Sequence, residues 1–332
     1  MRTVFYVPPL KRTSGGLANI GEIAADIRSV GGDAALMGPN TAGAFSDEAH
    51  KAGLRFIPWG ERLDPSDLWC VPESWPSSLG PGLQCGARIL VYVQSWSFML
   101  GDLPGGAPWS ALPFSFLAVS RPVREFLRLV HGIEAEDILP PAVDDAFFEP
   151  ADPSRANVRI AWSPRKNKSL GAQIRAIAEK CLRRSSISVD WVELIGMSRA
   201  EVARHLRSCR IFLSTGFPEG FGLLPLEAMA SGCVPVGFSG FGGWDYMRQA
   251  RLPGWEPYRP PLDLPDWGDD GNGFFFADGD VMGAGLGLAG AVRLLQNDPG
   301  YWARISANCR ATALRYSREA RLPAVERVFL RR

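Results

Sequence analysis

Residues 211–238 read IFLSTGFPEGFGLLPLEAMASGCVPVGF and decide the fold of this chain. The apolar ends of this stretch, 211–214 and 234–238, predict two buried strands, and the apolar residues 224–230 predict a helix between them. A glycine-containing turn joins the first strand to the helix. Such a turn directs unpaired backbone N–H groups and the positive end of the helix dipole beyond the strand end. We therefore expect an anion site here, of a kind that suits a phosphate.

The same alternation of short apolar runs and helical spacing extends over the rest of the chain. It is typical of a parallel sheet wrapped by helices, and it runs through two rounds that are split near residues 151–156. We predict two Rossmann-like α/β domains, 1–148 and 149–315, followed by a helical segment 316–332 that is interrupted near Pro323. The expected strands are 3–7, 34–37, 67–71, 89–93, 116–119, 158–162, 191–195, 211–214 and 234–238; the expected helices are 17–30, 170–182, 198–209, 224–230 and 299–315.

Length and composition exclude several classes of protein. The chain has 332 residues, 46% of them apolar and 21% charged, which excludes a disordered chain. Lys and Arg outnumber Asp and Glu by 36 to 35, so a general nucleic-acid binder is not expected. No run approaches the roughly 18–20 apolar residues of a membrane span, and residues 4–7 are too short for a signal-peptide core.

The six cysteines form no Cys-x-x-Cys pair. This spacing argues against a structural zinc site and against a disulfide scaffold. Unpaired cysteines of this kind are typical of a reducing compartment, and we therefore expect a cytoplasmic protein.

Charge is divided unevenly between the two predicted domains. Residues 1–150 contain 11 Lys and Arg against 17 Asp and Glu, a net −6, and residues 151–332 contain 25 against 18, a net +7. The second half is therefore the better host for an anionic ligand. Seven cations lie within 165–184, of which three directly follow an expected strand and four suit a solvated helix face. The first three are Arg165, Lys166 and Lys168; the last four are Arg175, Lys180, Arg183 and Arg184.

Two glutamates bracket the predicted phosphate turn. Glu219 lies in the turn and Glu227 lies in the helix, so that seven residues separate them. This segment resembles the signature of the retaining nucleotide-sugar glycosyltransferases of family 4, in which Glu-Gly-Phe-Gly-Leu precedes Glu-Ala-Met-Ala-x-Gly. The resemblance implies the GT-B fold, in which two Rossmann-like domains face each other across a cleft and a C-terminal helix crosses back to the first domain. It covers most of the chain, and 316–332 matches that final helix.

The resemblance implies a donor site for a nucleoside-diphosphate sugar. Glu219 would lie beside the donor sugar, and Glu227 would hold the ribose hydroxyls through two hydrogen bonds. Arg165 and a lysine would neutralise the diphosphate; Lys166 and Lys168 are alternatives, with Lys168 preferred. The further donor-binding residues that it implies are Gly15, Gly16, Phe221, Gly222, Leu223 and Leu224.

The acceptor side departs from the family pattern. Many members place a histidine in the first domain near the reacting sugar, whereas the three histidines here occupy other contexts. Gln94 and Trp96 instead end an expected strand at that place. Gln94 can hydrogen-bond a sugar and Trp96 can stack on one, and the end of a core strand explains both residues equally well.

The resemblance predicts transfer of a sugar to a glycan, lipid-linked or small-molecule acceptor, without a metal or other cofactor. A place at the cytoplasmic face of the membrane, in polysaccharide assembly, is an expectation from the family. The donor base, the sugar, the acceptor and the oligomeric state stay open. The missing histidine leaves a non-catalytic nucleotide-sugar-binding or assembly protein as the alternative. A dinucleotide-binding oxidoreductase would rest only on 285–290, GLGLAG, which has too little chain after it to complete such a sheet.

Overall fold

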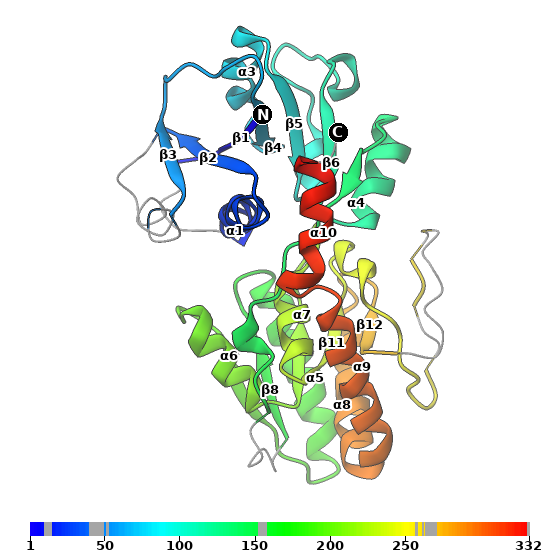
Figure 1. Cartoon of the computed structure of the whole chain (residues 1–332). Coiled ribbons are helices and arrows are strands. Elements are labelled where there is room, and N and C mark those ends of the chain that lie inside the picture. The colour runs from blue at the N-terminus through cyan, green and yellow to red at the C-terminus, as the bar shows by residue number, and fades with distance from the viewer. Residues whose placement is uncertain are drawn as a thin grey trace. The chain divides into compact units, whose positions relative to one another are not determined.

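The computed structural model describes residues 1–9, 15–39, 50, 53–151, 158–255, 258–260, 262 and 271–330. The chain divides into two compact units (Figure 1). Unit 1 comprises Met1–Ala142 together with Glu319–Arg332, and unit 2 comprises Val143–Arg318. The predicted boundary after 148 therefore lies inside unit 2. Both units are α/β, as the alternation in the sequence predicts.

Unit 1 is built on a seven-stranded sheet in the order β3-β2-β1-β4-β5-β6-β7, and every pairing between its strands is parallel. The strand order reverses direction between β1 and β4, and ligands of open α/β sheets bind at the carboxyl ends of the strands at such a point. β3 and β7 are short edge strands that the apolar pattern alone does not reveal. The strands are β1 (Arg2–Tyr6), β2 (Asp33–Gly38), β3 (Arg55–Pro58), β4 (Leu68–Pro72), β5 (Arg88–Val93), β6 (Ser115–Ala118) and β7 (Asp137–Ile138).

Helix α1 follows β1 and buries the apolar face that its spacing predicts. Leu17, Ile20, Ile23 and Ile27 are all at most 4% exposed. In the described part of unit 1, the helices between α1 and β7 are short, with at most six residues each. The described helices ahead of β7 are α1 (Gly15–Ser29), η1 (Pro76–Leu79), α3 (Gly80–Cys85), η2 (Trp96–Leu100), η3 (Trp109–Ala111), α4 (Arg121–Phe126) and the π-helix η4 (Leu127–His131).

The C-terminal helix α10 (Arg318–Phe329) belongs to unit 1 from Glu319 onward, which confirms the predicted crossing back to the first domain. Its Arg321 Nε donates to Asp26 Oδ2 at 2.8 Å, and both side chains are at most 2% exposed. The Phe329 ring meets the Phe5 ring with 5.8 Å between centroids. The predicted interruption at Pro323 was wrong, because the helix continues through it. Proline removes a single backbone donor, and these tertiary contacts hold the helix on both sides of it.

Unit 2 is built on a five-stranded sheet in the order β12-β11-β10-β8-β9, again parallel throughout. Strands β10 and β11 have the bounds that the sequence predicts. Strand β12 follows the long predicted loop 251–273, and its pairing with β11 is not visible in the sequence. Residues 256, 257, 261 and 263–270 of that loop lie outside the described part of the chain. The strands are β8 (Arg159–Trp162), β9 (Asp190–Glu193), β10 (Ile211–Ser214), β11 (Val234–Phe238) and β12 (Phe274–Phe276).

Two helices of unit 2, α6 and α8, contain motifs that the sequence displays. Helix α6 begins with the predicted capping box, formed by Ser198 and Glu201. The glycines of 285–290 lie inside α8, where a Cβ on Gly287 would lie 2.0 Å from the Phe276 ring. They allow close helix packing and form no dinucleotide turn. The helices are η5 (Asp145–Phe147), α5 (Lys168–Arg183), α6 (Arg199–Arg207), α7 (Leu223–Ala230), η6 (Gly242–Asp245), α8 (Val281–Asn297) and α9 (Pro299–Leu314).

Within the described residues, no helix has the length and apolar character needed to cross a membrane. All six cysteines are free thiols. In the part of the chain that the structure describes, no group of three or more His, Cys, Asp or Glu side chains is placed to bind a metal ion.

Candidate active site

The candidate site of unit 2 lies at the carboxyl ends of β8 and β10. The sheet order reverses between these two neighbouring strands, because β9 lies on one side of β8 and β10 on the other. The segment 163–168 leaves β8, and the segment 215–222 leaves β10. The strand order therefore brings the predicted cations and Glu219 to one edge of the sheet, where parallel α/β sheets bind their ligands.

Glu219 is held in place by its backbone. Its N–H donates to Gly240 O at 2.9 Å, and its carbonyl accepts from the N–H of Gly242 at 3.1 Å. A Cβ on Gly240 would lie 2.5 Å from Gly216 O and 2.9 Å from the Glu219 Cβ, so only glycine fits at that position. The turn that contains Glu219 is thus clamped to the loop that follows β11, and its carboxylate stays 29% exposed.

The loop that clamps Glu219 is in turn anchored by Asp278. The Gly240 N–H donates to Asp278 Oδ1 at 2.9 Å. Burial raises the pKa of Asp278 to about 6, and hydrogen bonds from the backbone of 239–241 offset part of that rise. This carboxyl group follows β12, so the unpredicted edge strand contributes to the architecture around Glu219.

Of the two candidate lysines, the structure brings Lys166 to Glu219. Lys166 Nζ lies 2.9 Å from Glu219 Oε1 and donates to Pro218 O at 2.7 Å. Asn167 adopts a left-handed backbone conformation (φ 54°), and its amide donates to Thr215 O and Phe217 O. These bonds join the two loops. Arg165 and Lys168 are exposed, and within the described residues they form no ion pair.

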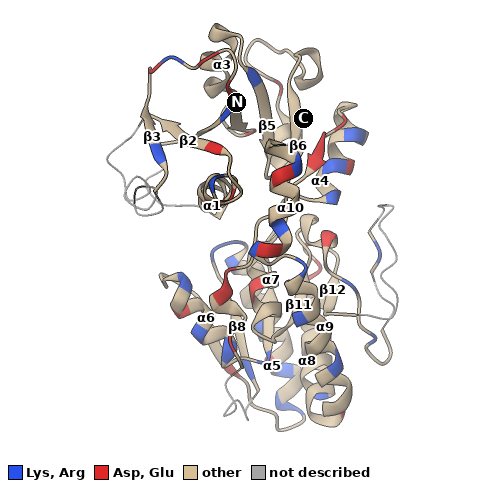
Figure 2. Cartoon of the chain, viewed as in Figure 1, with Lys and Arg blue, Asp and Glu red and all other residues tan. Residues whose placement is uncertain are grey.

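The remaining cations of 165–184 lie on or at the end of α5, which carries basic residues along its length (Figure 2). Arg175 is a structural residue: its guanidinium carbon lies 4.9 Å from the centroid of the Trp162 ring and 4.4 Å from that of Trp191. Its Nη1 also pairs with Glu193 at 2.9 Å. Lys180, Arg183 and Arg184 are exposed, which fits the solvated helix face, whereas Arg175 packs against the protein.

Helix α7 begins at the same edge of the sheet. Gly222 is its N-cap with φ 81°, and no side chain caps the first turn that contains Leu223 and Leu224. The Tyr246 hydroxyl donates to the Gly222 carbonyl. The Phe221 ring is 4% exposed and packs on the rings of Tyr246 and Tyr316. Phe221 therefore supports the turn through its buried side chain.

Glu227 lies in α7, and its side chain is 10% exposed. Arg199 Nη2 approaches Glu227 Oε1 at 3.4 Å. Arg199 is not among the site residues that the sequence predicts. The signal that could have found it is its charge at the first position of α6, where helices favour acidic residues.

Unit 1 brings two of its predicted site residues into contact. Gly15 and Gly16 open α1, and the preceding residues 10–14 lie outside the described part of the chain. A Cβ on Gly16 would lie 3.3 Å from Gln94 Oε1. The same oxygen accepts from Asn19 Nδ2 at 3.2 Å, which fixes the Gln94 side chain against the start of α1.

Trp96 lies in η2, and its ring centroid is 5.8 Å from that of Phe126 in α4. The ring therefore packs against α4. His131 ends η4 and packs on Phe126 as well. Neither His50 nor His205 follows the carboxyl end of a strand, so Gln94 occupies the strand end where the family resemblance leads one to expect histidine.

Glu73 is a buried carboxyl group that is not among the site residues predicted from the sequence. It directly follows β4 and is 3% exposed. Its two oxygens accept from the backbone N–H groups of Gln94 at 3.1 Å and Ser95 at 2.9 Å. Burial raises the pKa of Glu73 to about 7, and these two hydrogen bonds limit the rise. An acidic residue at the end of a predicted strand was the signal that could have revealed it.

We expect Glu73 to make the stability of unit 1 depend on pH. Its pKa is raised in the folded state, so the folded chain binds more protons than the unfolded chain between pH 4.5 and about 7. Stability should therefore fall as pH rises through this window, by about 3 kcal/mol in total. Urea unfolding at several pH values should show this fall in the free energy of unfolding for wild type and not for Glu73→Gln. The exposed Glu61→Gln variant serves as control, and parallel curves for wild type and Glu73→Gln would contradict the expectation.

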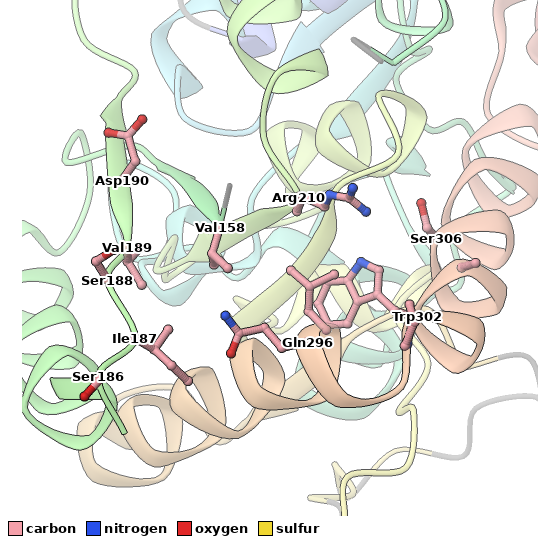
Figure 3. A pocket seen from close by; sticks show the side chains of 13 residues that line it. Val158, Ser186, Ile187, Ser188, Val189, Asp190, Arg210, Gln296, Trp302 and Ser306 are labelled. Atoms are coloured by element: carbon pink, nitrogen blue, oxygen red, sulfur yellow. The ribbon is translucent and has the colours of Figure 1, made fainter. Parts of the chain in front are cut away.

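A separate hollow of about 820 Å³ opens at the opposite end of the second sheet (Figure 3). Val158, Asp190 and Arg210 line it at the amino ends of β8, β9 and β10, and Gln296 and Trp302 line it from α8 and α9. None of the predicted site residues contributes to it. The hollow is therefore separate from the predicted site at the carboxyl ends of β8 and β10.

The class that these features define is the GT-B fold of glycosyltransferases: two Rossmann-like units with parallel sheets, and a C-terminal helix that belongs to the first unit. Solved structures share this fold. A glycosyltransferase from Rickettsia africae ESF-5 superposes with a TM-score of 0.70 at 13% identity, over 99% of this chain and 97% of that one. The pneumococcal O-GlcNAc transferase GtfA, solved with UDP and GlcNAc, gives a TM-score of 0.62 at 12% identity over 99% of both chains.

In sequence, the chain is similar to an alpha-1,6-glucosyltransferase of Actinobacillus pleuropneumoniae serotype 7 (strain AP76). The two are 40% identical over 105 residues. The aligned part spans 32% of this chain and 31% of that protein. No protein-family model matches the chain.

Proposed function

We propose that this chain is a retaining glycosyltransferase of family 4 that moves a sugar from a nucleoside-diphosphate donor to a glycan, lipid-linked or small-molecule acceptor. The observation that carries the proposal is the contact between Glu219 and Lys166 beside the uncapped start of α7. It combines an acid, a cation and free backbone donors at the carboxyl edge of one sheet. The GT-B fold and the similarity to a glucosyltransferase over 105 residues add support.

The donor half of the reaction belongs to unit 2 in this proposal. When the bond between the anomeric carbon and the diphosphate oxygen breaks, its electron pair stays on the phosphate and the sugar ring becomes positive. Arg165 and a lysine would balance the phosphate charge, together with the N–H groups of Leu223 and Leu224. The contact of Lys166 with Glu219 favours Lys166 over Lys168. Glu219 would stabilise the positive ring.

Retention follows if the acceptor hydroxyl attacks on the face that the diphosphate leaves. Its oxygen then bonds to the anomeric carbon, and its proton passes to the departing phosphate oxygen. This route requires no base from the protein and is therefore compatible with Gln94 in place of a histidine. In unit 1, Gly15 and Gly16 would let the backbone approach a phosphate, and Gln94 and Trp96 would contact the acceptor.

We place this activity in the cytoplasm, in polysaccharide assembly at the inner membrane face. The six free thiols suit a reducing compartment. We propose a reaction that needs no metal, because cationic side chains and backbone donors perform the charge neutralisation.

A thermal-shift titration with UDP, GDP, ADP and dTDP tests the donor site. At a ligand concentration 100-fold above Kd, binding should stabilise the protein by about 2.7 kcal/mol, a shift of a few degrees. We expect one nucleotide to give this shift and Glu227→Ala to lose it, because the variant lacks the carboxylate proposed for the ribose. Glu179→Ala, changed on α5, should behave as wild type.

Nucleoside-diphosphate sugars that contain the nucleotide found to bind are then tested as donors. The anomeric configuration of the product is determined by NMR. A product with the configuration of the donor is expected. An inverted product would overturn the retaining mechanism, and nucleotide binding without donor turnover would identify a non-catalytic binding protein. If no nucleotide shifts the melting temperature, the donor site itself is refuted.

A further inference from the structure

Arg199 is a cation at the end of a helix that favours anions. It is the first residue of α6, and the capping box of Ser198 and Glu201 fixes the start of this helix independently of it. The helix dipole disfavours a positive side chain in the first turn. The stability of α6 therefore gives no reason for an arginine here, and its role should be sought in its contacts.

The guanidinium of Arg199 lies among groups from two other elements of unit 2. Nη2 is 3.4 Å from Glu227 Oε1 in α7, and Nη1 is 3.8 Å from Asp144 Oδ2. The guanidinium carbon also lies 5.9 Å from the centroid of the Phe147 ring in η5. Arg199 is 35% exposed and Glu227 only 10%. The contact with Arg199 thus supplies a positive partner to a carboxylate that is nearly buried.

We propose that Arg199 is a positioning residue for the donor, which holds Glu227 so that the carboxylate is directed at the two ribose hydroxyls. This inference rests on the proposed function, in which Glu227 binds the ribose. An ionised carboxylate offers about four acceptor positions on its two oxygens. The contact with Arg199 involves Oε1 of the carboxylate. Without the arginine, the carboxylate would lose the contact at 3.4 Å that directs it, and the ribose hydroxyls would meet a less well oriented acceptor.

Calorimetric titration of two ligands distinguishes this positioning role from an effect of Arg199 elsewhere on the ligand or on the fold. The first ligand is whichever of UDP, GDP, ADP and dTDP binds wild type most tightly, and the second is its 2′,3′-dideoxy analogue. Wild type should prefer the first by ~10–100-fold, the range for hydrogen bonds to a charged group. Arg199→Gln should lower the affinity for the nucleotide by about tenfold and leave the affinity for the dideoxy analogue within about twofold of wild type. Only the nucleotide has the ribose hydroxyls that bind the oriented carboxylate. Arg199→Lys should recover part of the preference.

Arg204→Gln is the matched control, since Arg204 is an exposed arginine on the same helix. It should bind both ligands as wild type does. An equal loss of affinity for both ligands in Arg199→Gln would overturn the inference, because Arg199 would then act elsewhere on the ligand or on the fold. An unchanged preference would overturn it as well, while the proposed function would stand. If wild type binds none of the four nucleotides, the proposed function fails, and the inference fails with it.

Discussion

Glu219→Gln should reduce sugar transfer at least ~100-fold while leaving nucleoside-diphosphate affinity within about threefold, because a neutral amide no longer stabilises a positive sugar ring. The fold should tolerate the change. Glu219 and Lys166 are 29% and 38% exposed, so the loss of their ion pair should alter stability by less than about 1 kcal/mol. Transfer rates and nucleotide titrations on the same preparation measure both quantities.

The control for Glu219→Gln is Glu179→Gln, the same chemical change on α5 of the same unit. It should keep the full transfer rate. Unchanged turnover in Glu219→Gln would refute a catalytic role for Glu219. Loss of nucleotide affinity in parallel with turnover would instead assign Glu219 to donor binding.

Arg321→Met should destabilise unit 1 by about 3–5 kcal/mol, the cost of leaving a buried charge without its partner. Arg321 and Asp26 are 2% and 1% exposed. Arg321 Nη1 also donates to Asn19 Oδ1 at 3.2 Å, and Asn19 in turn donates to Gln94. The variant should therefore loosen both the attachment of α10 and the position of Gln94. Urea unfolding measures the stability.

Arg327→Met on the same helix is the matched control. Its partner Asp137 and Arg327 itself are 24% and 56% exposed, so the change should cost less than about 1 kcal/mol. The double variant Asp26→Leu with Arg321→Met should recover much of the lost stability, because it removes both charges of the buried pair. If Arg321→Met is as stable as Arg327→Met, the buried pair does not hold the helix.

The sequence by itself determined what contiguous residues encode. The apolar runs at 211–214 and 234–238 gave the bounds of β10 and β11, and Ser198 with Glu201 predicted the start of α6. Apolar periodicity and capping depend on neighbours within a few positions, so one chain is enough to display them. The same local pattern marked Glu219 and Glu227 as candidates for the site.

Only the tertiary structure decided which distant groups meet. Arg321 and Asp26 lie 295 positions apart, and Glu73 meets the backbone of Gln94 from a different strand. The pairing of Arg199 with Glu227 likewise joins two helices. A buried charge takes its partner from whichever element the sheet order brings beside it, and strand order is a property of the whole chain. Local spacing contains no trace of that order, which is why these contacts could not be predicted.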